Sequence, residues 1–293
     1  MKNRRRPPNV LQRPMVRWSW FFLLPMVSAF AIGFVWPFLQ GIYLSFCDFR
    51  LISDAKWVGL KNYISVFQDT NFMRSFGYTA VFAVVSLAII NVLAFMVAYV
   101  LTLEIKGSNI FRTVFFMPNL IGGIVLGYIW QLIFDGIFSH FNTALKLDAN
   151  LGFIGLVILI CWQQIGYMMI VYIAGLQAIP ESLKEAAMID GCNPLQTFFM
   201  IVMPMLKPTM VSVAILEAMW VWNDYLLPTL VLDIREYQTI PMLIQTSFKG
   251  GYGRVEMGAM MACIMLTVIP IVIVYLLGQK HIIKGVAAGA VKG

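Results

Sequence analysis

Two acidic residues, Glu217 and Asp224, interrupt an apolar run that carries no other charge. In an α-helix, a spacing of seven residues places two side chains on one face, two turns apart. Aromatic and amide residues surround them. Aromatic faces with a few hydrogen-bonding groups suit a neutral, hydroxyl-rich solute, and acids inside a membrane mark solute pathways. The candidate binding residues are Glu217, Trp220, Trp222, Asn223, Asp224 and Tyr225.

A second cluster of the same chemistry lies upstream in another apolar run. It consists of Trp162, Gln163, Gln164 and Tyr167, of which we take Trp162 and Gln163 as further candidates. Structural roles stay open for both clusters, because polar side chains also hydrogen-bond membrane helices to one another. Trp and Tyr also favour membrane interfaces. A role as partner to a neighbouring subunit remains open for Glu217.

Other chemistries lack the residues that they need. The sequence has no G-x-x-x-x-G-K-[ST] run, the loop that cradles nucleotide phosphates. Its cysteines form no C-x-x-C pair and no metal-ligand spacing; they are Cys47, Cys161, Cys192 and Cys263. We predict that the protein is not an enzyme, binds no metal and holds no cofactor of its own.

The composition indicates that these residues belong to a membrane protein. Of 293 residues, 60% are hydrophobic and 12% are charged, whereas soluble domains carry about 25% charged residues. Several uncharged stretches are long enough to cross the roughly 30 Å hydrocarbon core as helices, and they lack the alternation of a membrane barrel. We predict an all-α polytopic membrane protein with six transmembrane helices, at about 18–46, 77–103, 112–134, 151–178, 209–232 and 256–278.

The first of these runs follows a basic segment, as a signal-peptide core does. It extends from Trp18 to Phe46, however, and no A-x-A-like site follows it. A signal-peptide core has only about 7–15 residues. We therefore expect the run to be retained as the first span.

The distribution of charge predicts the orientation. An even number of spans puts both termini on one side of the membrane. The two tails, the 104–112 turn and the 179–208 segment hold 13 Lys and Arg against 4 Asp and Glu, whereas the opposite loops hold 8 of each kind. Because Lys and Arg concentrate on the cytoplasmic side, both termini and residues 179–208 are predicted to be cytoplasmic. The net charge of +7 is thereby explained without nucleic acid.

The cytoplasmic segment 179–208 is predicted to form two short helices. Pro180 suits the first position of one helix, and Gly191 ends it because glycine enters the left-handed region freely. Asn193 then caps a second helix, expected over Leu195–Met203 and ending near two prolines, Pro204 and Pro208. The alanine pair of the first helix offers a face that another backbone can approach closely. An ordinary connecting loop is the alternative.

The loop contains the pattern E-A-A-x-x-x-G at 185–191, followed by an apolar stretch and P-x-x-x-P at 204–208. This pattern resembles the signature loop of the permease subunits of binding-protein-dependent ABC importers, and more narrowly of the maltose and glycerol-3-phosphate permease type. The resemblance covers nearly the whole chain. It is supported by W-P-F-L-Q-G-I-Y-L-S-F (36–46), V-G-L-K-N-Y (58–63), F-F-M-P (115–118), W-N-D-Y (222–225) and A-G-A-V-K-G (288–293).

The resemblance implies a type I ABC importer transmembrane fold with a cytoplasmic coupling helix. The residues expected to couple to the ATPase are Glu185, Ala186, Ala187, Asp190 and Gly191. The implied partners are two ATPase subunits that use ATP and Mg²⁺, a second permease subunit, an extracytoplasmic solute-binding protein, the lipid bilayer and a small carbohydrate. The implied location is a bacterial or archaeal plasma membrane. The external segment 47–74 and the loop 233–255 are expected to meet the binding protein.

The expected organisation follows from these spans. It comprises a basic cytoplasmic tail (1–17), a first transmembrane helix (18–46), an external segment (47–74), a five-helix core that includes the coupling loop (75–280) and a second cytoplasmic tail (281–293). The chain lacks the extra spans and the large external domain of the larger maltose permease subunit. Its N-terminal half resembles one permease of the usual pair, whereas W-N-D-Y and the C-terminal residues resemble the other. A heterodimer is expected, with a homodimer left open.

Two other functions fit a membrane protein of this kind. A proton-coupled secondary sugar carrier would use Glu217 and Asp224 as titrating sites. The six spans show no internal repeat and no further buried ionisable pair, so they offer few groups to carry a proton across the membrane. A membrane scaffold or sensor would need neither of the aromatic and amide clusters. Both alternatives rank below a permease subunit of an ATP-driven carbohydrate importer.

Overall fold

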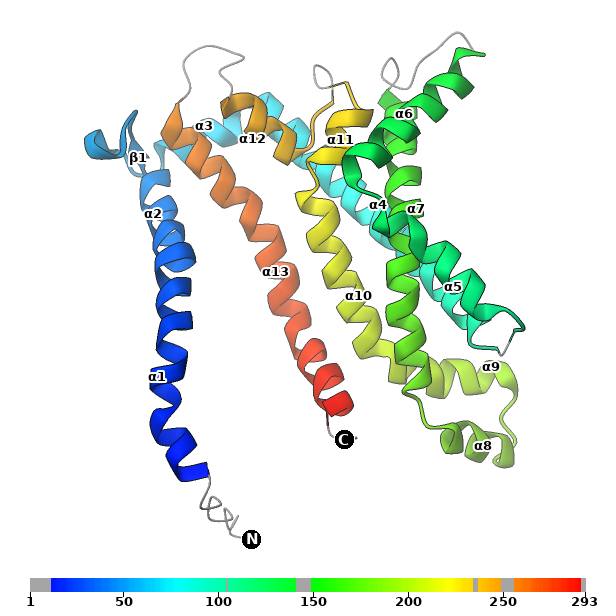
Figure 1. Ribbon diagram of the computed structural model, residues 1–293. Helices are drawn as coiled ribbons and strands as arrows, with labels where there is room; N and C mark the ends of the chain where they lie inside the picture. Colours follow the sequence, from blue (N-terminus) through cyan, green and yellow to red (C-terminus); the bar gives the residue numbers. More distant parts are fainter. Residues whose placement is uncertain (1–11, 104, 141–148, 234–236, 249–255, 291–293) are drawn as a thin grey trace. The chain divides into compact units, whose positions relative to one another are not determined.

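The computed structural model describes residues 12–103, 105–140, 149–233, 237–248 and 256–290. The chain divides into two compact units. The smaller comprises Met1–Val66 and Glu256–Met265, and the larger comprises Phe67–Val255 and Leu266–Gly293. Each is described separately, with the elements labelled as in Figure 1.

Within the described residues, five helices are long and apolar enough to cross a membrane. They are Trp18–Ser45, Thr70–Leu101, Asn150–Gln177, Pro194–Asn223 and Met257–Lys280. A sixth candidate consists of Ser108–Leu120 and Gly123–Ser139, which are bent by 98° at their junction. The predicted all-helical membrane fold is confirmed.

The smaller unit joins a long helix to a compact cap. The helix runs through α1 (Gln12–Phe30), a π-helical stretch η1 (Ala31–Val35) and α2 (Trp36–Ser45). The cap contains the antiparallel strands β1 (Cys47–Asp48) and β2 (Lys56–Trp57), the 3₁₀ turn η2 (Ile52–Asp54) and the start of α3 (Lys61–Gln68). The Asn62 amide donates to the carbonyls of Ser45 and Cys47, both at 2.9 Å, and so ties α3 to the end of α2.

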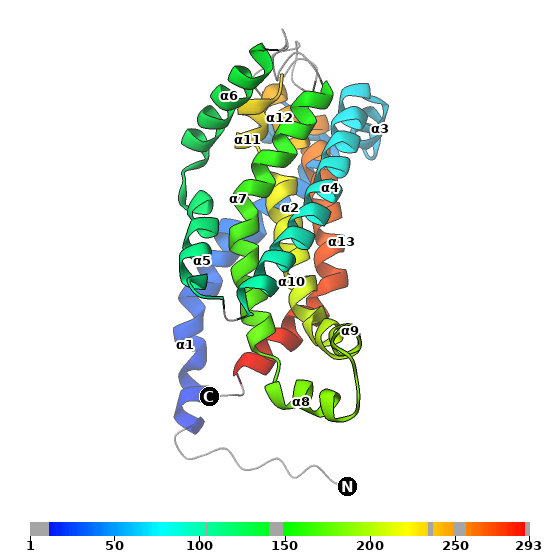
Figure 2. The same ribbon diagram turned by 90° about the vertical axis from the view of Figure 1, so that its right-hand side faces the viewer.

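The larger unit is built around the central helix α7. Its elements are α4 (Thr70–Leu101), α5 (Ser108–Phe116), η3 (Met117–Leu120), α6 (Gly123–Ser139), α7 (Ala149–Gln177), α8 (Glu181–Ile189), α9 (Pro194–Thr197), η5 (Phe198–Val202), α10 (Met203–Asn223), α11 (Leu226–Val231), α12 (Ile240–Phe248) and α13 (Met257–Ala290), the last of which begins in the smaller unit. Helix α7 packs against α4, α5, α10 and α11 (Figure 2).

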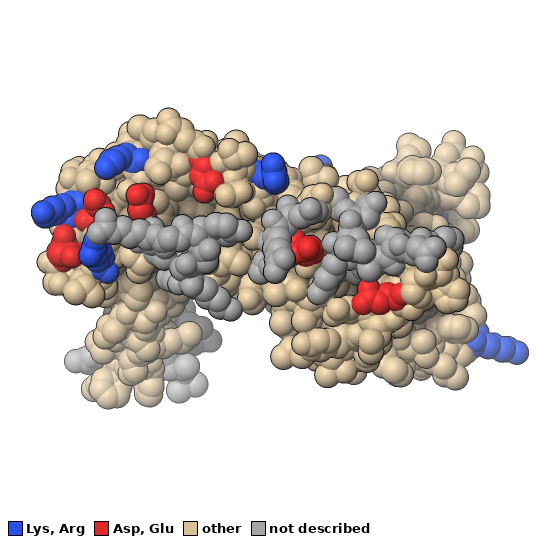
Figure 3. Space-filling model, turned by 90° about the horizontal axis from the view of Figure 1, so that it is seen from above, with Lys and Arg blue, Asp and Glu red and all other residues tan. Residues whose placement is uncertain are grey.

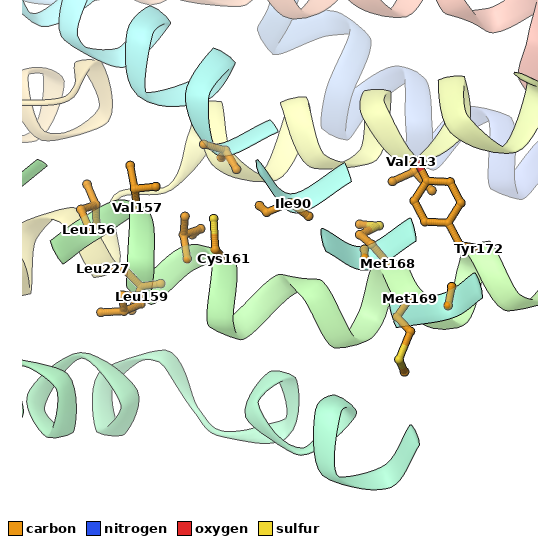
Figure 4. Packing of buried hydrophobic residues seen from close by; sticks show 14 of the residues in the cluster. Ile90, Leu156, Val157, Leu159, Cys161, Met168, Met169, Tyr172, Val213 and Leu227 are labelled. Carbon is orange, nitrogen blue, oxygen red and sulfur yellow. The ribbon is translucent and has the colours of Figure 1, made fainter. Parts of the chain in front are cut away.

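The core of the larger unit lies along α7. Figure 4 shows Met168 and Tyr172 of α7 near Ile90 of α4 and Val213 of α10, and Leu156 farther along α7 near Leu227 of α11. The Tyr172 hydroxyl donates to Asn91 Oδ1 at 2.7 Å, which joins α7 to α4 inside this apolar layer. A polar pair satisfied in this way holds membrane helices together.

Glycine allows the closest approach of helices in this unit. At Gly166 of α7, an added Cβ would collide with the backbone carbonyl of Phe115, so α5 lies directly against α7. A glycine at such a position lets two backbones pack as small residues do at membrane helix interfaces.

The third expected span, 112–134, is broken in the structure. Pro118 lies in the 3₁₀ turn η3, and the chain then bends at Gly122 before α6 begins at Gly123. Proline and paired glycines favour such a break.

The fifth span also differs from its expected limits of 209–232. The helix begins at Pro194 and ends at Asn223. The prediction that a second short helix ends near Pro204 and Pro208 is therefore wrong. Pro204 lies in the first turn of α10 and Pro208 lies inside it, after the π-helical stretch η5. Proline is tolerated inside such helices because neighbouring groups satisfy the carbonyls that it leaves free.

The two ends of the larger unit carry different elements. Helices α8 and α9 and the α4–α5 turn lie at one end, and α11 and α12 lie at the other (Figures 1 and 2). Seen from above, acidic and basic side chains lie close together over one part of the surface, and few charged side chains are visible over the rest (Figure 3).

Candidate functional site

A pocket of about 580 Å³ lies inside the larger unit. Helices α6, α7, α10 and α11 and the break between the last two form its wall. The lining residues are Gly123, Ile160, Gln163, Gln164, Met219, Trp220, Asn223, Asp224, Tyr225, Leu226 and Leu227. The structure thus brings together five of the eight residues proposed for substrate binding: Gln163, Trp220, Asn223, Asp224 and Tyr225.

The pocket forms where two helices begin after breaks in the backbone. Helix α11 starts at Leu226 after the break at Asp224, and α6 starts at Gly123 after the bend. An added Cβ on Gly123 would lie 2.9 Å from Leu226 Cδ2, so the glycine lets these two helix starts meet. Non-helical backbone within a membrane is tolerated where it lines a cavity, and such breaks mark binding sites in transporters.

The depth of the pocket follows from α7. Gln163 and Gln164 are the two central residues of the span Asn150–Gln177. Gln164 is only 3% exposed, and its Oε1 accepts a hydrogen bond from the Asn119 amide at 3.3 Å. The pocket therefore offers amide groups near the middle of a span.

Asp224 has two roles at this pocket: it caps a helix and it lines the wall. Its backbone is extended (φ −68°, ψ 119°), so α10 ends before it. Its Oδ1 accepts hydrogen bonds from the backbone N–H groups of Leu226 at 3.0 Å and Leu227 at 3.3 Å. The carboxylate thus caps α11 while lining the pocket. The expectation that Asp224 shares a helical face with Glu217 is wrong, because the helix stops between Asn223 and Asp224.

Aromatic and amide groups complete the wall. Trp220 is 59% exposed, which leaves much of its ring free to contact a solute. The Asn223 amide donates to the Met219 carbonyl at 2.7 Å, so its Oδ1 stays available as an acceptor. One aromatic face, amides and one carboxylate are the groups that bind a hydroxylated ring.

Three of the sequence candidates lie off the pocket. The Trp222 ring is largely buried; its Nε1 donates to the Thr267 carbonyl at 3.0 Å, and it meets Phe76 edge-on at 5.6 Å. Trp162 packs edge-on against Trp130 at 5.4 Å. Glu217 is fully buried, and neither of its carboxyl oxygens has a hydrogen-bond partner in the described part of the chain.

At the opposite end, the loop between α7 and α10 forms the predicted pair of kinked helices. Gly191 follows α8 at φ +80°, the left-handed region. The Cys192 N–H donates to the Ala187 carbonyl at 2.9 Å and the Gly191 N–H donates to the Met188 carbonyl at 3.1 Å. These two bonds form a Schellman motif, which ends a helix at glycine.

The second helix of this loop is also capped as predicted. Asn193 Oδ1 accepts from the Gln196 N–H at 2.8 Å, and Gln196 Oε1 accepts from the Asn193 N–H at 2.9 Å. Pro194 occupies the first turn of α9. This reciprocal capping box satisfies two otherwise free donors. Pro180 departs from its prediction: it is the N-cap of α8, and the helix begins at Glu181.

The exposed surface of α8 differs from the predicted alanine face. Glu185, Ala186 and Asp190 are exposed, whereas Ala187 is only 4% exposed and faces the protein. Only Ala186 of the pair is therefore open to close approach. Met188 (65% exposed) and Ile189 (85%) complete the exposed surface.

Sequence reasoning missed several residues of these sites. Gly123 and Leu226 on the pocket are ordinary members of apolar runs, and only the helix breaks bring them together. Met188 and Ile189 did carry a usable signal. They are large apolar residues in a segment assigned to water, where exposed apolar surface indicates a partner.

Comparison with known proteins identifies the family. Residues 90–288 match the family described as binding-protein-dependent transport system inner membrane component. The chain belongs to this family and is a multi-pass permease subunit of an ABC importer.

Named relatives match most of the chain. A probable starch degradation products transport system permease protein, AmyD of Thermoanaerobacterium thermosulfurigenes, is 41% identical over 199 residues, covering 65% of this chain and 68% of its own. AmyC of the same organism, named in the same way, is 32% identical over 242 residues (82% and 84%). The sn-glycerol-3-phosphate permease UgpA of Brucella abortus is 32% identical over 215 residues (70% and 73%).

Solved structures share the fold. A bacterial ABC transporter that imports the acidic polysaccharide alginate superposes with a TM-score of 0.71 at 18% identity, covering 93% of this chain and 98% of that one. The alginate transporter in complex with a pentasaccharide-bound periplasmic protein gives 0.68 at 16% identity, over 92% and 96%. The likeness shows the transmembrane architecture of an ABC importer.

Proposed function

We propose that the protein forms one half of the translocation path of an ATP-driven carbohydrate importer and transmits the motion of the ATPase to it. The observation that supports this proposal is the pocket of about 580 Å³ at two helix breaks in a chain of the importer family. The pocket holds solute-binding groups at mid-depth, and the kinked α8–α9 loop lies at the far end of the same unit (Figure 1).

The pocket favours a neutral sugar. Trp220 provides a ring face, and Gln163 and Asn223 provide amides for hydroxyl groups. Asp224 is the charged group of the lining, and its carboxylate accepts hydroxyl hydrogen bonds but repels an anion. Of the solutes for which the relatives are named, starch degradation products suit this chemistry better than glycerol-3-phosphate. Trp222 and Trp162, which lie off the pocket, are proposed to hold neighbouring helices together through Thr267 and Trp130, and Glu217 is proposed to have a structural role.

The exposed side of α8 is proposed to dock on a separate ATPase subunit. Glu185 and Asp190 provide charges for partner cations, and Ala186 permits close approach. Met188 and Ile189 supply apolar area at the centre of the contact. Gly191 fixes the angle between α8 and α9, while Ala187 anchors α8 to the protein.

Transport then follows from a rigid link between this loop and the pocket. ATP and Mg²⁺, bound by the partner ATPases, supply the energy. The helix that begins at Pro194 continues through η5 and α10 to Asn223 on the pocket wall. A displacement of the α8–α9 loop therefore moves the pocket wall, as rigid-body alternating access requires.

The proposed assembly contains partners besides the ATPases. A second permease completes the path, in keeping with the two relatives AmyC and AmyD from one organism. A heterodimer is proposed, and an extracytoplasmic binding protein delivers the sugar. The protein is placed in a bacterial or archaeal plasma membrane with both termini in the cytoplasm, as the charge bias favours.

Uptake by the assembled transporter in vesicles tests the docking surface. Glu185→Lys is expected to abolish ATP-driven sugar uptake while membrane insertion is kept, because it reverses a charge at the contact. Asn109→Lys is the matched control: it places a lysine on the exposed first turn of α5 at the same end of the unit. Normal uptake by the Glu185 variant would exclude this docking surface.

Glu217 is buried and has no hydrogen-bond partner within the described residues, and this observation favours the proton-coupled carrier as the second candidate. The two functions differ in their energy source. Vanadate should stop uptake by the ATP-driven importer, and an uncoupler should stop uptake by the carrier. Inhibition by the uncoupler alone would replace our proposal with the carrier.

A further inference from the structure

We infer that the cap of the smaller unit rests in the lipid headgroup layer at the C-terminal end of α2, and that Trp57, Leu60 and Ile64 enter the bilayer surface. We call these three residues the lipid-facing patch. The inference concerns the 47–66 part of the segment that the sequence assigned to a binding protein. It does not depend on the transport activity or on the identity of the solute.

The depth of the patch follows from strand pairing. The first span ends at Ser45, and Cys47, two residues later, pairs directly with Trp57. Two extended residues reach about 7 Å, and paired residues of antiparallel strands lie about 5 Å apart. Trp57 is therefore held within about 12 Å of the end of the first span, and we place it in the interfacial layer that such a span end reaches.

An aromatic cluster surrounds this tryptophan. Phe46 stacks on Trp57 with ring centroids 5.2 Å apart, and Tyr43 of α2 lies 5.9 Å away. Trp57 nevertheless remains 62% exposed. Tryptophan and tyrosine gather at membrane–water interfaces, where an apolar ring with a polar edge is favoured.

The start of α3 has three distinct sides. Asn62 and Val66 are buried against the cap, and Lys61 and Ser65 form an exposed polar side. The third side is exposed but apolar: Leu60 is 62% and Ile64 is 55% exposed. The Ile64 N–H donates to the Leu60 carbonyl at 3.0 Å, so these residues lie one helical turn apart on the same face. A helix with adjacent apolar and polar sides fits a membrane surface.

The bilayer explains this exposure better than a protein that docks from water. The patch continues the surface of the first span, whose apolar window is 0% buried within the chain. Lys56 and Lys61, both exposed, adjoin Trp57 and Leu60 in the sequence and suit lipid phosphates. A docking partner that leaves and returns would expose the three apolar residues to water in every cycle.

Site-directed spin labelling of the complete transporter in lipid vesicles tests the inference. Three of the four cysteines, Cys47, Cys161 and Cys263, are buried, so replacing Cys192 with serine gives a background with little labelling. Single labels are then introduced by Leu60→Cys and Ile64→Cys, with Ser65→Cys on the polar side as the matched control. The background without an added cysteine measures residual labelling, and the yield of assembled transporter after purification shows whether each variant folds.

The surroundings of each spin label are determined from its collision rates with two paramagnetic reagents. Oxygen concentrates in lipid, and a nickel chelate stays in water. Labels at 60 and 64 are expected to favour oxygen and the label at 65 to favour nickel, without added binding protein. Equal nickel access at all three positions would overturn the inference. So would protection of 60 and 64 that appears only when the binding protein is added, which would assign the patch to that partner. The lipid pattern is read from the labels alone, so its presence supports the inference even if the proposed transport function fails in its own test.

Discussion

Two breaks between helices, one after α8 and one after α10, lie at different depths of the larger unit and are built differently. After α8 the chain turns through Gly191 at φ +80°, and backbone N–H groups satisfy the free carbonyls. After α10 the backbone at Asp224 is extended, and a side-chain carboxylate satisfies the first N–H groups of α11. The first break requires a backbone conformation that glycine adopts easily, and the second requires the chemistry of one side chain.

The surroundings explain this difference. In the exposed α8–α9 loop, water can replace a lost hydrogen bond, so geometry is the property that must be preserved. At the pocket, a free N–H has few alternative partners, because the membrane supplies none. A substitution at Gly191 is therefore expected to act through backbone strain, and one at Asp224 through an unsatisfied polar group.

The largest effect is predicted for Gly191→Val. A β-branched residue at φ +80° is strained by about 1–3 kcal/mol, although an added Cβ meets nothing within 4 Å. The strain should open the Schellman turn and turn α8 away from its docking position. ATP-driven uptake should be lost while the amount of inserted protein stays normal, as measured by transport and by immunoblots of membranes.

Gly191→Asn is the matched control for this prediction. Asparagine tolerates the left-handed region much better than valine, so this variant should retain a large part of the uptake. If valine and asparagine reduce uptake equally, the turn geometry is not what the loop requires.

The next effect is predicted for Asp224→Ala. Removal of the carboxylate leaves the N–H groups of Leu226 and Leu227 without the acceptor that caps α11. The loss of such a cap costs about 0.5–2 kcal/mol. Thermal unfolding of the purified transporter should occur at a lower temperature, and uptake should fall.

Asp224→Asn separates the cap from the charge. The amide oxygen can still accept both hydrogen bonds, so thermal stability should return while any contribution of the charge to uptake stays lost. Equal destabilisation by alanine and asparagine would show that the cap is not the origin of the effect.

A smaller effect is predicted for Trp220→Ala, which removes the exposed ring of the pocket. Aromatic contacts contribute about 0.5–1.5 kcal/mol, so the sugar concentration for half-maximal uptake should rise roughly 2- to 10-fold. The measurement uses excess binding protein, so that delivery is not limiting. The ring of Trp162 packs against Trp130 away from the pocket, so Trp162→Ala should leave this concentration nearly unchanged. A larger increase for Trp162→Ala than for Trp220→Ala would contradict the pocket assignment.

The sequence predicts the α8–α9 loop better than the pocket for a physical reason. Gly191 and Asn193 act on the next few residues, so their types reveal the turn and the cap directly. Proline is less informative in a membrane. Pro204 and Pro208 suggest a helix end, yet the helix continues through both, because neighbouring groups can satisfy the carbonyls that proline leaves free.

The pocket depends on contacts between distant parts of the chain. Gln163 of α7 and Trp220 of α10 are visible as candidates, but their meeting with Gly123 depends on the bend before α6. The seven-residue spacing of Glu217 and Asp224 is even misleading. It places both side chains on one face only if the helix continues through Asp224, whereas the helix ends at Asn223. Such breaks arise from the packing of several helices, which a local pattern does not record.

Glu217 belongs to neither break, and the smallest effect is predicted for Glu217→Gln. The side chain is fully buried without a hydrogen-bond partner in the described residues, so a neutral amide of similar volume should change stability by less than roughly 1 kcal/mol. Uptake should stay close to normal. Glu217→Lys is the contrasting variant, because an uncompensated cation at this position should prevent stable folding. A strong loss of uptake by the glutamine variant, with normal amounts of folded protein, would mean that the protonatable carboxyl itself is needed, as in a proton-coupled carrier.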